Sequence, residues 1–279
     1  DDGGIRGMSE LIILEKIMYR LTQLEQAICM PKFRDYFDII GGVGTGGYCY
    51  CIDALMLGRL RMPIASALEK YIDFSKKVYS DIKIFSMEPG RFKTSTFVSA
   101  MEDIDILQSA NFPEDVLLQE ENPVCKSFVT ALPSAHMTPR IFRSYEVRAN
   151  QGYNCTVVQA AHATTATPQF FEPVSIGSEG LNEKFIGAHL EYNNPINFVL
   201  EEADLVFGAS QQVACIVSIG AGHSGHISWK LTKLELFSEN FTNILLDISA
   251  SSEASVQSFV KQYKNLPGIF YRLNIEQGP

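Results

Sequence analysis

The sequence contains no apolar run long enough to span a bilayer, no internal repeat and no low-complexity segment. A transmembrane helix needs about 20 consecutive apolar residues, so we expect no membrane-spanning segment. Positive charge is also scarce, because 23 Lys and Arg stand against 32 Asp and Glu and give a net charge of −9. This balance disfavours nucleic acid as a partner and provides no basic patch for an anionic membrane surface.

Paired cysteines are absent as well. Six cysteines are scattered through 279 residues without the regular spacing of a disulfide framework. Such scatter is typical of reduced thiols and predicts an intracellular, cytoplasmic location. The histidines do not form a ligand pattern either: His223 and His226 lie close together, but no matching third ligand accompanies them. We therefore expect no metal and no cofactor.

Composition and periodicity predict a single α/β domain over residues 1–279. Hydrophobic residues make up 46% of the chain, enough for a full core, and apolar runs alternate with amphipathic helical patterns. Strands are expected at 36–40, 126–132, 140–147, 213–219 and 269–275. Helices are expected at 9–28, 48–60, 63–79, 156–166, 195–207 and 253–264. The more polar stretch from 80 to 124 is expected to be a lid-like or variable region.

The most informative segment is YFDIIGGVGTGGYCYC at 36–51, where a buried-strand pattern is followed by a glycine-rich turn and the start of a helix. This order is typical of a nucleophile elbow, in which a strained turn holds a serine hydroxyl above the sheet and beside the next helix. Gly44 stands at the position of that serine. Glycine accepts the geometry but brings no hydroxyl, so the shape of a hydrolase site is kept without its nucleophile.

The same letters match GxGxxG, at Gly42, Gly44 and Gly47, a pattern that can bind a dinucleotide between a strand and a helix. That fingerprint also requires a second strand ending on an acidic residue about 20 positions later. Residues 63–79 have helical periodicity instead. A second match at 220–225 continues into HISWKL, which has little helical character. We therefore do not expect a dinucleotide site.

Three further segments show a resemblance to a known family. The chain opens with DDGGIRG, continues through the elbow, has FIGAHLEYNNP at 185–195 and has VACIVSIGAGH at 213–223. In order and spacing these segments resemble the patatin-like phospholipases, and LGRLRM at 57–62 and PQFFEP at 168–173 resemble the fungal branch. The resemblance implies a three-layer α/β/α fold with a mostly parallel central sheet, and a lipid or acyl-chain ligand. It also implies a strand before the first motif and flanking modules, so we expect a fragment.

The chain departs from the family pattern at each catalytic element. That pattern has DGGGxRG for the oxyanion loop, GxSxG for the nucleophile and DGG or DGA shortly before NNP for the catalytic aspartate. The oxyanion loop would comprise Asp2, Gly3, Gly4 and Arg6. Gly44 takes the serine position, Gly187 the aspartate position, and Asp2 replaces a glycine. The resemblance implies an aspartate that activates the serine without a histidine, so nucleophile and base are lost together.

Several residues are candidates to replace the lost groups. Thr45 carries a hydroxyl, but a shift of one residue turns its side chain away from the oxyanion donors. Cys49 lies near a helix start, where a thiolate is favoured, although such cysteines usually pack. His189 and Glu191 would lie beside the former aspartate and form an acid–base cluster with Asp2, although loop residues of these types are more often solvated. Asp2 itself either opposes a developing oxyanion, or it points to solvent or pairs with Arg6 near the start of the following helix, where an acid is favourable.

The sequence therefore predicts a descendant of a patatin-like lipid acyl hydrolase, a phospholipase A or esterase, that is catalytically inactive and keeps an acyl-binding or interaction role. Two alternatives stay open. The first is an active lipid acyl hydrolase that uses the displaced residues. The second is an N-terminal effector or interaction domain of a larger fungal multidomain protein, with protein partners or fused domains.

Overall fold

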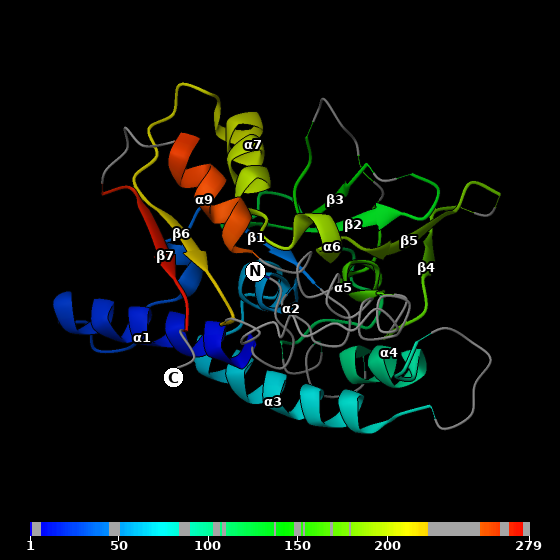
Figure 1. Ribbon diagram of the computed structural model, residues 1–279. Coiled ribbons are helices and arrows are strands. Elements are labelled where there is room, and N and C mark those ends of the chain that lie inside the picture. Colours follow the sequence, from blue (N-terminus) through cyan, green and yellow to red (C-terminus); the bar gives the residue numbers. More distant parts are fainter. Residues whose placement is uncertain are drawn as a thin grey trace, which may run out of the picture.

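A computed structural model places the strands that it describes in two sheets, with helices on both sides of them (Figure 1). It describes residues 1, 7–44, 51–83, 90–102, 107, 110–136, 138–147, 152, 154–167, 170–178, 180–222, 252–262 and 268–275. None of the helices within these ranges is long and apolar enough to cross a membrane. The α/β class predicted from the sequence is confirmed.

The larger sheet is built around one long strand, β2. Its strands are β1 (Ile39–Val43), β2 (Lys126–Pro133), β3 (Arg140–Arg143), β4 (Val174–Ile176) and β5 (Glu183–Gly187). β1 pairs with β2 in parallel, whereas β3 and β5 pair with β2, and β4 with β5, in antiparallel orientation. The prediction of a mostly parallel sheet is therefore wrong. The chain between β2 and β3 is too short for the crossover that a parallel pair would need, so these strands form an antiparallel pair.

β1 and β5 share one edge of β2. Phe128–Thr130 pairs with β1 on one edge and with β3 on the other, and Ala131 pairs with both Arg140 of β3 and Gly187 of β5. Because β3 occupies one edge, β5 must continue along the edge that β1 uses. The carboxyl ends of β1 and β5 therefore meet beside the middle of β2.

A second, smaller sheet holds β6 (Ile216–Ile219) and β7 (Phe270–Leu273), which are parallel. Ile216 packs with Ile196 and Phe259 in a hydrophobic cluster that is separate from the main core. The strands predicted at 213–219 and 269–275 are confirmed in shorter form.

The helices cover both sides of the strands. They are α1 (Met8–Leu24), α2 (Cys51–Ala54), α3 (Ile64–Ser80), α4 (Thr94–Glu102), α5 (Val157–Thr165), α6 (His189–Tyr192), α7 (Ile196–Phe207) and α9 (Glu253–Gln262), with the 3-10 helix η2 (Phe33–Asp35) and the π-helix η3 (Leu55–Arg59). α2 contacts β1, and α5 contacts β2 and β5. In the view of Figure 1, α3 and α4 lie below these helices, and α7 and α9 lie above β1.

The position of β1 depends on a close approach between two strands. Gly41 pairs with Phe128, and a Cβ at residue 41 would overlap the Phe128 ring. Only glycine at residue 41 leaves room for that ring. The strand therefore includes Gly41 and Gly42. The predicted strand at 36–40 therefore lies three residues too early, and β1 ends directly before Gly44.

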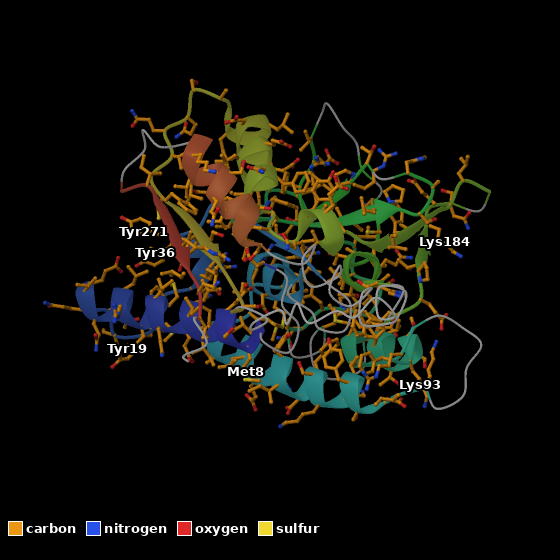
Figure 2. The ribbon with its side chains drawn as sticks, in the orientation of Figure 1. Met8, Tyr19, Tyr36, Lys93, Lys184 and Tyr271 are labelled. Carbon is orange, nitrogen blue, oxygen red and sulfur yellow. The ribbon has the colours of Figure 1, made fainter. Side chains whose placement is uncertain are left out.

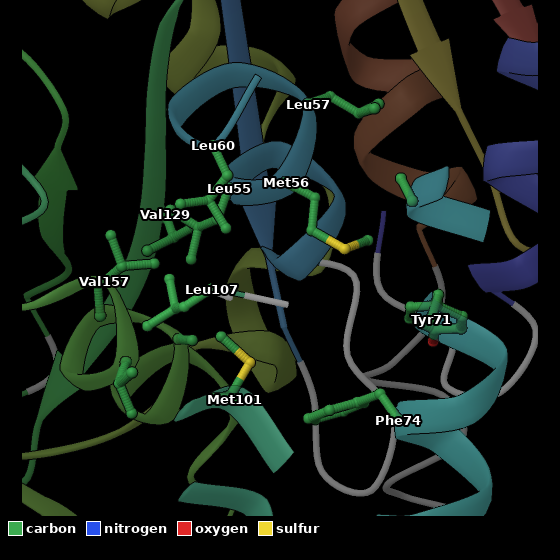
Figure 3. Close-up of a cluster of buried hydrophobic side chains, with 14 of the residues drawn as sticks. Leu55, Met56, Leu57, Leu60, Tyr71, Phe74, Met101, Leu107, Val129 and Val157 are labelled. Atoms are coloured by element: carbon green, nitrogen blue, oxygen red, sulfur yellow. The ribbon is translucent and has the colours of Figure 1, made fainter. Parts of the chain in front are cut away.

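The main core lies between the larger sheet and the helices below it. In Figure 3, Leu55 of η3 lies near Val129 of β2, with Val157 of α5 and Met101 of α4 below them. α4 belongs to the stretch predicted to be lid-like, but its Phe97, Ala100 and Met101 are fully or almost fully buried. This part of the stretch is a built-in helix of the domain.

Candidate functional site

Gly44, the predicted nucleophile position, follows the last residue of β1 and is buried. Val43 pairs with Thr130 of β2, which fixes the end of the strand. The Gly44 N–H donates a hydrogen bond of 2.9 Å to the hydroxyl oxygen of Thr164, near the end of α5. A buried amide is thus satisfied by a side chain from a segment far away in the sequence.

Gly187, the predicted aspartate position, is the last residue of β5. It pairs with Ala131, the residue after the partner of Val43, and its N–H donates to the Ala166 carbonyl at 3.1 Å. A Cβ built at residue 187 would lie 3.5 Å from the Gly44 carbonyl oxygen. The two positions that the sequence singled out separately are therefore neighbours in the fold.

The space for a side chain at residue 187 is already occupied. A Cβ there would lie 2.8 Å from the Thr164 carbonyl oxygen and 3.0 Å from the Thr167 hydroxyl oxygen. Real Cβ atoms essentially never approach a backbone atom this closely. The end of α5 thus fills the volume that an aspartate side chain would need.

α5 brings these groups to the site because its sequence allows a deeply buried helix. Its start is a capping box: the Thr156 hydroxyl accepts from Gln159 N–H at 3.1 Å, and the Gln159 side chain accepts from Thr156 N–H at 3.0 Å. Small Ala and Thr side chains follow, and they let the helix contact β2 and β5. His162 packs on Phe97, and its ring nitrogen lies 2.9 Å from the Glu172 carbonyl oxygen, a structural role.

Most of the other predicted site residues lie outside the described residues. This applies to Asp2, Gly3, Gly4, Arg6, Thr45 and Cys49. For His189 only the backbone, at the start of α6, is described. Glu191 is exposed on α6, and its interaction with Tyr192, together with the stronger effect of burial, raises the pKa of that tyrosine. The predicted cluster of Asp2, His189 and Glu191 thus stays a prediction.

Sequence reasoning missed the threonines that surround the two glycines. Thr164, Thr165 and Thr167 are almost completely buried, and so is Thr130 of β2, whose hydroxyl has no hydrogen-bond partner among the described residues. The signal available in the sequence was the run of Ala and Thr through the second half of α5. That run indicated packing, but it did not reveal which strand ends the helix would face.

Two buried carboxyl groups, one from α1 and one from α2, line a cavity of about 380 Å³. Glu10 of α1 and Asp53 of α2 are 6% and 5% exposed. Burial raises the pKa of Glu10 to about 7, against the opposite effect of the Asp1 nitrogen. Burial and, secondly, the nearby Glu10 raise the pKa of Asp53 well above its usual range. Both groups therefore favour the protonated form more than an exposed carboxyl does.

The Thr164 hydroxyl gives the first testable prediction. Thr164→Val keeps the shape of the side chain but leaves the buried Gly44 N–H without its acceptor, which we expect to lower the free energy of unfolding by about 1–3 kcal/mol. Urea denaturation measures this loss. Thr165→Val is the matched control, because the Thr165 hydroxyl only donates to carbonyls of its own helix. Equal losses in the two variants would contradict the assigned role of Thr164.

A family model described as patatin-like phospholipase matches residues 3–200. Among curated proteins, Patatin-like protein 2 of Arabidopsis thaliana is 24% identical over 215 residues, which cover 72% of this chain and 51% of the plant protein. The chain thus spans about half the length of that relative.

Proposed function

The chain belongs to the patatin-like phospholipase family, and from that premise we propose that it descends from a lipid acyl hydrolase, a phospholipase A or esterase, and no longer catalyses the reaction. In this proposal the domain keeps a role in binding acyl chains or in interactions with partners. The family points to lipids as the ligand class.

One observation carries the proposal: the two neighbouring positions at the ends of β1 and β5 are both glycine. By the motif pattern, Gly44 stands for the serine nucleophile and Gly187 for the aspartate that activates it. Glycine provides neither a nucleophilic oxygen nor a base. Loss of a nucleophile that acts as a unit with its base removes several orders of magnitude in rate, and loss of the second member adds little.

The surroundings of the glycines support the same proposal. The Gly44 N–H is bound by the Thr164 hydroxyl, and the Thr164 carbonyl and Thr167 hydroxyl fill the space beside Gly187. A site that had lost only its serine would still have room for an aspartate side chain at residue 187. Here the end of α5 has taken that volume, which favours a binding or structural use of the scaffold.

The active alternative would require Thr45, Cys49, His189 or Glu191 to supply the chemistry. Of these, Glu191 is the residue whose side chain is described, and it is exposed to solvent on α6. An exposed carboxylate is a weaker base than one desolvated in a site. This observation favours the inactive protein over the active alternative.

We expect hydrolysis of p-nitrophenyl esters and of phospholipid vesicles to stay at background. The reason is the absence of both members of the catalytic pair, and the measurement is release of p-nitrophenol and of free fatty acid by the purified protein. Turnover that persists through purification and disappears in Cys49→Ala, Thr45→Val or His189→Ala would overturn the proposal in favour of the active alternative.

The proposal also covers the setting of the domain. Its place in the fungal branch rests on the segments at 57–62 and 168–173, and an intracellular, cytoplasmic location rests on the scattered cysteines. A role as the N-terminal effector or interaction domain of a larger protein rests on the resemblance alone. Sequencing the full-length gene tests that role.

A further inference from the structure

The segment LGRLRM at 57–62, which plays no part in the glycine pair, contains a local change of helix geometry. η3 is a π-helix, in which the Leu60 N–H donates to the Leu55 carbonyl at 2.7 Å, one residue further along the chain than in an α-helix. Single turns of this kind are rare and occur frequently at functional positions. η3 ends at Arg59, whose side chain is 4% exposed. The π-helix thus ends on a buried positive charge that needs partners.

The partners of Arg59 lie in one surface segment, residues 112–120, which we call the strap. Arg59 Nε donates to the Leu118 carbonyl at 2.8 Å, and Arg59 Nη2 donates to the Leu117 carbonyl at 2.7 Å. The guanidinium carbon also lies 5.0 Å from the centre of the Phe112 ring, a cation–π contact. One buried side chain therefore holds the strap at two of its carbonyls and at one of its rings.

This anchor differs from the ion pairs on the surface. Lys93, labelled in Figure 2, pairs with Asp81 at 2.7 Å, but its side chain is 49% exposed, and exposed pairs contribute little to stability. Glu120 of the strap pairs with Arg61, which is 38% exposed, and lies 3.8 Å from Arg59 Nη1, too far for a hydrogen bond. The charge-assisted bonds from Arg59 to the two carbonyls are therefore the strongest polar attachment of the strap.

Apart from these bonds, the strap has little to hold it in place. All of its residues are described, and they form neither a helix nor a longer strand. Leu118 is its one completely buried apolar side chain. Four of its residues are exposed: Pro113, Glu114, Asp115 and Leu117. Segments with few buried apolar contacts open locally at a lower free energy than the whole domain needs to unfold.

The strap covers the start of α5. The Leu118 N–H donates to the Cys155 carbonyl at 2.7 Å, and the Val157 N–H donates to the Val116 carbonyl at 3.0 Å. Cys155 directly precedes the helix cap at Thr156 and is 2% exposed. Burial raises the pKa of the Cys155 thiol to about 12, so the thiol is unreactive while the strap is in place. Loss of the strap would break both hydrogen bonds and bring this thiol into contact with water.

We propose that the strap opens as a local unit, that Arg59 is the residue that holds it closed, and that its opening frees the start of α5. The other end of this helix contacts Gly44 and Gly187, so a surface segment controls how firmly the helix of the glycine pair is held. Removal of Arg59 shifts the equilibrium toward the open strap. The proposal does not depend on whether the domain hydrolyses lipids.

Native-state labelling with N-ethylmaleimide tests the opening, with the modified cysteines identified by peptide mass spectrometry. Cys125 is the internal reference, because it is also 2% exposed but lies directly before β2. Cys155 should react at least about tenfold faster than Cys125, since local opening costs less free energy than unfolding. Low urea concentrations should hardly change the Cys155 rate, because a local opening exposes little surface. Equal rates, or a urea dependence as steep as that of global unfolding, would overturn the proposal.

Variants of the two arginines test the role of Arg59. Arg59→Met removes both bonds to the carbonyls and should raise the Cys155 rate about ten- to a hundredfold, the factor expected for a hydrogen bond to a charged group. Arg61→Met is the matched control, because Arg61 comes from the same segment and pairs with the same strap. Its effect should stay below about fivefold, as for an exposed ion pair.

The reference cysteine separates this role from a general loss of stability. In Arg59→Met the Cys125 rate should stay close to that of the parent. An unchanged Cys155 rate, or an equal rise at both cysteines, would overturn the assignment of Arg59. Should Arg59→Met not fold, Arg59→Lys takes its place with the same expected rise, because an ammonium lacks the planar fork that bonds both carbonyls.

Discussion

Glu202→Ala is expected to lower the free energy of unfolding by about 3–5 kcal/mol, because it leaves a buried arginine without its counter-charge. Glu202 of α7 is 1% exposed and Arg143 of β3 is 6% exposed. Two guanidinium nitrogens of Arg143 each lie 2.5 Å from a Glu202 oxygen, and the Tyr145 hydroxyl donates to Glu202 at 2.8 Å. Burial and the nearby Glu202 carboxylate raise the pKa of Tyr145, so this tyrosine stays a donor.

Thermal and urea unfolding measure the effect. A loss of this size should lower the melting temperature by roughly 6–15 °C for a domain of this length. The control is the double replacement Arg143→Met with Glu202→Leu, which removes both charges and fills similar volume. It should recover most of the stability, because a buried ion pair and a well-packed apolar pair are often close in free energy. A single variant as stable as the parent would show that Arg143 reaches water.

Gly187→Asp is expected to lower the free energy of unfolding by about 3–5 kcal/mol, even though it introduces the residue that the resemblance implies at this position. Overpacking accounts for about 1–3 kcal/mol, because the new Cβ lies 2.8 Å from the Thr164 carbonyl oxygen. A carboxylate in this buried place adds the cost of an unpaired charge. Gly187→Ala is the matched control and isolates the steric share, and urea denaturation of both variants gives the difference.

The double variant Gly44→Ser with Gly187→Asp tests whether the proposed catalytic pair can be restored. A hydroxyl and a carboxylate would be neighbours there, but only if the end of α5 moves away from Thr164 and Thr167. Suppose that Gly187→Asp is as stable as the parent and that the double variant hydrolyses esters. The end of α5 would then move aside at little cost in free energy, and its close contacts with residue 187 would have no bearing on function.

The elements that sequence reasoning predicted are those whose pattern is local. The helical periodicity of residues 63–79 became α3, and the helix predicted at 156–166 became α5. The short strands β4 and β5 were missed, because their pairing depends on β2. β1 was placed too early, because glycine has low strand propensity, and the fit between Gly41 and the Phe128 ring is a tertiary contact.

The candidate site, like the fold, could be predicted from the sequence only in part. The assignment of Gly44 and Gly187 from motifs and spacing stays a prediction, and the structure places the two residues close together. The occlusion by Thr164 and Thr167 did not follow, because no local rule states which strand end a helix terminus will contact. Glu10 and Asp53 were not singled out either. An acid on an amphipathic helix usually faces solvent, and only packing reveals the two that do not.

α7 links the larger sheet to the hydrophobic cluster around Ile216 of β6, and this has a consequence for cooperativity. Through Glu202 it is tied to β3 of the larger sheet, and through Ile196 it packs on β6 and α9. Two clusters with separate cores can open as separate units unless an element shared by both couples them. The free energy of the Arg143–Glu202 contact therefore adds to the coupling between the larger sheet and the part of the molecule that packs on α7, and its loss would favour the separate opening of that part.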